Sequence, residues 1–179
     1  MGRTTVNGVD IGGGVGTPIF DKAVASTAAW TEDSVFNFTT YVRYVLFIQG
    51  LVLATDNQPL RIAGRASGAG IGANVDRFCS SMATNNAITS VGASGETNSA
   101  LLPSNLDNVA SVHGSIEFFG VNPPIAAHVK LDARLATAGL FIKSLGGGNT
   151  FRVAIDGFSI TSGSGNISVA RAKLVGYTS

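Results

Sequence analysis

The chain closes on "FRVAIDGFSITSGSGNISVARAKLVGYTS" (residues 151–179), and this stretch indicates the fold class. It holds two runs rich in β-branched and aromatic residues, which are typical of strands. Between them, "TSGSGN" (161–166) contains only residue types that favour turns or loops. The pattern predicts two strands of opposite direction that pair as a hairpin, with the C-terminal strand held inside a sheet.

A second apolar run, "YVRYVLFIQGLVLA" (41–54), is too short to cross a membrane, which takes about 20 residues. Its continuous β-branched and aromatic residues predict a strand that is buried on both faces. Turn residues follow at Asp56, Asn57 and Pro59, and an alternating strand begins at Leu60.

Two later segments, 112–118 and 125–131, alternate apolar and polar residues, which predicts strands with one face in the core. The predicted core residues are Val112, Ile116, Phe118, Ile125, Ala127, Val129 and Leu131. About eight to ten short strands with turn residues between them indicate an all-β sandwich or barrel. No helical period is long enough to suggest βαβ units. We therefore predict one β-sandwich domain over residues 41–179.

Residues 1–40 are predicted to be an N-terminal arm and lead-in. Five glycines lie between Gly8 and Gly16, and the apolar residues around them are isolated. Such a stretch cannot form its own core, so it is either a disordered tail or an extended arm that docks on a partner. The expected docking residues are Val6, Val9 and Ile11. The segment "DKAVASTAAW" (21–30) is predicted to form a short helical turn.

The composition favours a surface that other proteins cover. Only 13% of the 179 residues are charged, which is about half the usual share, and the net charge is +1. A monomer with a large core and a surface of small residues is the alternative. Basic residues are balanced by acidic ones and scattered along the chain, which argues against nucleic acid as a partner. No segment predicts a membrane partner, and the first residues lack the apolar run of a signal peptide.

Nothing in the sequence predicts catalysis, a metal site or a cofactor. The two histidines, His113 and His128, lie on the polar faces of predicted strands and have no nucleophile motif beside them. The carboxylates are spread almost singly, and no metal-binding motif occurs. The Gly-rich loops lack the Lys of a phosphate-binding loop. We therefore expect a protein that is not an enzyme.

Binding of a glycan is the chemical role that the sequence leaves open. β-Sandwiches bind glycans through exposed aromatic rings and short polar side chains. Trp30 and Tyr177 flank the predicted β region and are the candidates for such contact. Packing between subunits explains these two rings equally well.

Three segments together resemble virion surface proteins of tailed bacteriophages. "YVRYVLFIQGLVLATDNQPLRIAGRASGAG" (41–70) is similar to a strand–turn–strand of that family, with its "ATD" turn. "GSIEFFGVNPP" (114–124) resembles a G-x-I segment that ends in N-P, and "FSITSGSGNISVARAKLVGY" (158–177) resembles the terminal segment. The resemblance covers roughly residues 30–73 and 108–177, which is most of the chain. It implies a jelly-roll-like antiparallel β-sandwich, usually trimeric, and brings no catalytic residue.

The family includes capsid decoration (cement) proteins and the tips of head or tail fibres. We expect some forty residues of Gly-rich arm, and no long fibrous shaft, before the domain. We therefore expect a homotrimeric decoration protein that binds the major capsid protein or another virion protein. The alternative is a receptor-binding tip that contacts a host surface glycan. Either protein would be made in the host bacterial cytoplasm and would reside on the virion surface. A hydrolase of surface polysaccharide would need a carboxylate pair in a groove, and the scattered acids argue against it.

Overall fold

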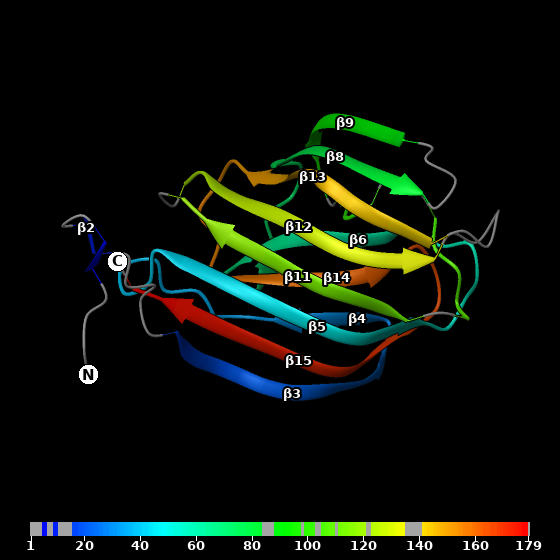
Figure 1. The fold of residues 1–179 in the computed structure, drawn as a ribbon, viewed down its shortest axis with the longest axis horizontal. Helices are drawn as coiled ribbons and strands as arrows, with labels where there is room; N and C mark the ends of the chain where they lie inside the picture. The colour runs from blue at the N-terminus through cyan, green and yellow to red at the C-terminus, as the bar shows by residue number, and fades with distance from the viewer. Residues whose placement is uncertain are drawn as a thin grey trace.

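The computed structural model describes residues 5–6, 9–10, 16–83, 88–97, 99–102, 105–109, 111–120, 123–134 and 141–178. All regular structure in these residues is β-strand, in antiparallel sheets. Two of the sheets enclose one hydrophobic core as a β-sandwich (Figure 1). The predicted all-β sandwich is therefore confirmed, while jelly-roll connectivity and an extended course for the N-terminal arm stay predictions.

The larger sheet has eight strands and faces the viewer in Figure 1, from β3 at the bottom to β9 at the top. In spatial order these strands are β3 (Thr17–Thr27), β15 (Ile167–Tyr177), β5 (Arg43–Leu53), β11 (Val112–Phe119), β12 (Ile125–Arg134), β13 (Phe141–Phe151), β8 (Val75–Ala83) and β9 (Ile88–Glu96). The strands β15, β5 and β11 lie side by side in this order, so the larger sheet joins segments far apart in the sequence.

The smaller sheet lies behind the larger one in Figure 1. Its strands, in spatial order, are β10 (Ser99–Ala100), β6 (Leu60–Ala66), β14 (Gly157–Ser162) and β4 (Ala29–Glu32), and β7 (Ala69–Gly70) pairs with β6. The strands β1 (Thr5–Val6) and β2 (Val9–Asp10) form a separate two-stranded sheet.

The predicted C-terminal hairpin is wrong. β14 pairs with β4 and β6 in the smaller sheet, whereas β15 pairs with β3 and β5 in the larger one. Residues 163–166 therefore form a β-arch, a turn that carries the chain from one sheet to the other. A short Gly/Ser loop suits either connection, and the alternation of a strand does not say which sheet it joins.

Three such arches stack against one another at one end of the sandwich. Ala28 links β3 to β4, residues 54–59 link β5 to β6, and 163–166 link β14 to β15. The amide of Ala54 donates to the carbonyl of Asn166 at 2.8 Å, and the amide of Gly163 donates to the carbonyl of Pro59 at 3.0 Å. The side-chain amide of Asn166 also lies 3.1 Å from Ser26 Oγ. These bonds satisfy polar backbone groups that leave the sheet ladders at the turns.

Strands begin well before the boundary predicted at residue 40. Residues 17–27 form β3, an edge strand, so the helical turn predicted over 21–30 is wrong. Most side chains of β3 are exposed, and several are small. An edge strand of this kind buries little apolar surface, so its sequence carries little hydrophobic alternation.

The strand β5 is buried on one face only, which corrects the prediction of burial on both faces. Tyr44, Leu46 and Ile48 point into the core, whereas Phe47 is 45% exposed. Gly50 has a φ of +67° and sits where the register with β11 shifts. This bulge changes the alternation by one residue, so the buried positions beyond it are Leu51 and Leu53.

Phe36, in the segment between β4 and β5, joins the two sheets. Its ring lies 4.9 Å from Tyr44 and 4.7 Å from Phe118, both in the larger sheet. It also lies 5.9 Å from Phe158 in the smaller sheet. The Phe36 amide donates to the carbonyl of Asp156 at 2.9 Å, which fixes the lead-in beside β14. The aromatic cluster thus fills one region of the core from both sides.

A buried carboxylate connects the edges of the two sheets. Glu32 in β4 accepts a hydrogen bond from Trp30 Nε1 at 2.5 Å. Lys22 Nζ in β3 lies 2.7 Å from Glu32 Oε1 and 2.9 Å from Glu32 Oε2. The Trp30 ring packs edge-on against Phe158 at 5.4 Å. Both donors compensate the burial of the carboxylate.

We expect adjacent residues of β5 to differ sharply in their effect on stability. Leu46→Ala should lower the free energy of unfolding by about 2–5 kcal/mol, because it leaves a cavity in the core. Phe47→Ala, on the opposite face, should cost about 1 kcal/mol or less. Urea denaturation followed by circular dichroism measures both values. Equal losses would mean that β5 is buried on both faces.

Removal of the Glu32 carboxylate should weaken the edge where β3 and β4 meet. Glu32→Ala leaves the Trp30 N–H buried without an acceptor, which should lower the free energy of unfolding by about 1–3 kcal/mol. Glu32→Gln is the matched control, since it keeps an acceptor oxygen for Trp30 and loses only the ion pair with half-exposed Lys22. Equal destabilisation by the two variants would contradict the role assigned to the Trp30 hydrogen bond.

Candidate binding face

The outer face of the larger sheet, which is the side turned away from the smaller sheet, carries the polar side chains of its central strands. Lys173 of β15 and Ser115 of β11 are the cross-strand neighbours of Phe47. Arg171 of β15 is the neighbour of Gln49. Adjacent residues in such a row lie close enough to contact one ligand together.

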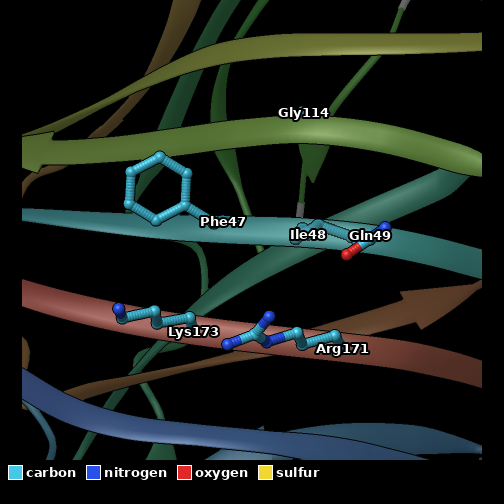
Figure 2. Close-up of a pocket in the computed structure, with 6 residues that line it drawn as sticks. All are labelled: Phe47, Ile48, Gln49, Gly114, Arg171 and Lys173. Carbon is cyan, nitrogen blue, oxygen red and sulfur yellow. The ribbon is translucent and has the colours of Figure 1, made fainter.

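A hollow of about 460 Å³ opens on this outer face. The residues that line it are Phe47, Ile48, Gln49, Gly114, Arg171 and Lys173. Figure 2 shows Phe47 and Gln49 on β5, with Lys173 and Arg171 on the neighbouring strand β15. An aromatic ring, an amide and two cationic side chains therefore border one depression.

Gly114, which lines the hollow, occupies a position that requires glycine. A Cβ there would lie 2.0 Å from the carbonyl oxygen of Lys130, and the φ of +141° is one that L-residues rarely adopt. The preceding side chain, His113, turns aside. Its Nδ1 accepts a hydrogen bond from the Gly50 amide at 3.3 Å, and its Nε2 lies 2.7 Å from Ser111 Oγ.

An ion pair holds Arg171 at the border of the hollow. Its Nε and one terminal nitrogen donate to the two carboxylate oxygens of Asp21, at 2.9 Å and 2.7 Å. The Arg171 hydrogen bond lowers the pKa of Asp21, and the positive charge of Lys173 lowers it further. Within the described part of the chain, no carboxylate lies within ion-pair distance of Lys173 Nζ.

Tyr177, a predicted glycan contact, lies half-buried at the end of β15 on the same outer face. The guanidinium of Arg43 lies 4.4 Å from the centre of its ring. The same Arg43 donates to Glu117 Oε1 at 3.2 Å. The Arg43 guanidinium thus covers one face of the Tyr177 ring in a cation–π contact, while it is also paired with Glu117.

Trp30, the other predicted glycan contact, is only 2% exposed and packs in the core. Its ring is therefore not at the surface, and the prediction of glycan contact fails for it in this structure. The sequence misleads here because the indole N–H of Trp30 can find a hydrogen-bond acceptor at the surface or in the core. In this structure the acceptor is the buried Glu32, two residues away.

The structure describes two of the three predicted docking residues. Val6 and Val9 are paired in the separate sheet of β1 and β2, and Ile11 lies outside the described residues. Their role in docking stays a prediction.

Sequence reasoning did not predict the side chains around the hollow. Phe47 was assigned to a fully buried strand, and the two cations appeared only as scattered charges. A signal exists in Gly50, because a glycine inside a strand often marks a bulge that changes which residues face outward.

The described residues hold neither a cluster suited to a metal ion nor a helix suited to a membrane. No three His, Cys, Asp or Glu side chains there come together closely enough to hold a metal ion. No helix there has the length and apolar character needed to span a membrane. Comparison of the chain with protein-family models, curated proteins and solved structures found no match.

Loss of the Arg171 guanidinium should raise the pKa of Asp21 toward its usual value. The pKa is depressed in the folded protein, so the ion pair stabilises the fold above the usual pKa of Asp and this stabilisation disappears as the pH falls through the lowered pKa. NMR titration of the Asp21 carboxyl in Arg171→Gln measures the shift.

Arg152→Gln is the matched control for that titration. Arg152 makes the same two-pronged contact with Asp76, and its hydrogen bond lowers the pKa of Asp76. This variant should raise the pKa of Asp76 and leave that of Asp21 unchanged. An unchanged Asp21 titration in Arg171→Gln would refute the assignment.

Proposed function

We propose that the protein is a non-enzymatic structural protein of a bacteriophage particle, a homotrimeric decoration protein that stabilises the capsid. The segments that resemble phage virion surface proteins correspond to β5–β6, β11 and β14–β15. β6 and β14 are the central strands of the smaller sheet, and β15, β5 and β11 lie side by side in the larger one, so the resemblance concerns the framework of the domain. That correspondence supports a shared architecture with such proteins.

The observation that best supports a structural role is a surface with few charges and several exposed apolar side chains. Only 13% of the residues are charged. Val42, Val52, Val109 and Phe119 are all more than one-third exposed among the described residues. Contact with other subunits would remove this apolar surface from water, which is the main driving force of stable association.

The proposed mechanism is burial of apolar surface at several contacts at once. Each sandwich packs against its copies, and the residues Val6, Val9 and Ile11 dock on the major capsid protein. A trimer that holds three docking segments binds with an effective concentration that a single segment lacks. Such a clamp would oppose separation of neighbouring capsid subunits.

The second candidate is the receptor-binding tip of a fibre. Tyr177 on the outer face favours it, because a half-buried ring with a polar hydroxyl suits glycan contact. Adhesion of the purified protein to host cells that free sugar abolishes would favour this candidate over decoration.

Binding to capsids without the protein tests the leading proposal. The variant Val6→Asp/Val9→Asp/Ile11→Asp should lose most of its binding, because charged side chains oppose burial of the docking residues. Cosedimentation with capsids measures the bound fraction. Thr4→Asp/Thr5→Asp/Asn7→Asp adds the same charge at polar positions and should bind like the wild type.

Two results would contradict the proposal. Equal binding by the two triple variants would exclude the docking role of the three apolar residues. Light scattering that gives the mass of a single 18.3 kDa chain at micromolar concentration would exclude the trimer.

A further inference from the structure

We propose that the hollow between β5 and β15 binds an acidic sugar, with one face of the sugar ring on Phe47 and its carboxylate on Lys173 and Arg171. The inference does not rest on the proposed structural role, and its test uses the isolated full-length protein. It assigns a ligand class to residues for which the sequence predicted no function.

Phe47 supplies the apolar part of the site. Its side chain is 45% exposed at the centre of a sheet, between strands on both sides. The backbones of Gly114 and Ile48 line the hollow beside it. A pyranose ring has an apolar face of C–H groups, and an aromatic side chain on a rigid strand provides a matching surface at little entropic cost.

Lys173 and Arg171 supply the charge. Asp21 already accepts two hydrogen bonds from Arg171, which holds the guanidinium in place while its side chain stays 61% exposed. Lys173 has no carboxylate within ion-pair distance among the described residues. A carboxylate on the ligand would therefore complete the pairing of Lys173.

Asp21, the cross-strand neighbour of Lys173, already neutralises Arg171, so the net positive charge at this end comes from Lys173. Glu117 is engaged by Arg43, and Asp132 lies two strands from β5, on β12. The Gln49 amide lines the hollow with a donor and an acceptor, which suits the hydroxyl groups of a sugar.

A comparison of an acid with its ester tests the proposal. Trigalacturonic acid should bind the wild-type protein at millimolar concentration or below, and its methyl ester, which keeps the rings and loses the charge, should bind about tenfold more weakly. Changes in NMR amide shifts should follow binding at Phe47, Gln49 and Lys173. Added salt should weaken binding of the acid and leave binding of the ester unaffected.

Matched variants locate the site. Phe47→Ala and Lys173→Gln should each weaken trigalacturonate binding about tenfold. Phe119→Ala and Lys130→Gln make the same changes elsewhere on the outer face and should keep wild-type affinity. Circular dichroism confirms that each variant is folded.

Four results would overturn the proposal. They are the absence of saturable binding at millimolar trigalacturonate, equal affinity for acid and ester, equal weakening by the control variants, and equally effective displacement by inorganic phosphate. The last result would mean that the site recognises charge without a sugar. None of these results bears on capsid docking, so failure of this proposal and failure of the proposed function remain distinguishable.

Discussion

Packing of aromatic side chains between the two sheets is the contact on which the sandwich depends. Phe36 touches Tyr44 and Phe118 on one side and Phe158 on the other, and its backbone is bonded to the segment before β14. A residue outside both sheets thus holds them together. The Lys22–Glu32 pair adds a polar connection at the neighbouring edge.

This inward packing determines which side chains of β5 lie on the outer face. The buried side chains on β5 are Tyr44, Leu46 and Ile48. The residues between them, Val45 and Phe47, therefore point away from the core. The bulge at Gly50 then reverses the alternation, and Gly114 lines the hollow beside Phe47. The hollow is therefore a product of strand register, and its ligand contacts sit on rigid strands.

The sequence predicted the alternating strands and missed their partners. The buried positions from Val112 to Leu131 are as expected, because alternation reports directly which side of a strand meets the core. It does not report which sheet a strand joins, so β14 and β15 were wrongly paired. Leu101, Leu102 and Leu106 are buried although their segment resembles a loop, since tertiary contacts bury them without a periodic pattern. The hollow could not be predicted, because it needs the register of three strands from distant segments.

The stacked arches have a consequence for how the chain reaches this fold. Each arch sends one strand to each sheet, so the two strands that an arch joins never pair with each other. β5 meets β15 and β14 meets β6 only after the intervening chain has been brought back. Loop closure must precede these pairings, which makes folding slow for a small domain. Because each arch joins one strand of each sheet, the two sheets must form together. A half-formed sandwich would expose unpaired strand edges, and a newly made chain would need protection from aggregation until its last strand is in place.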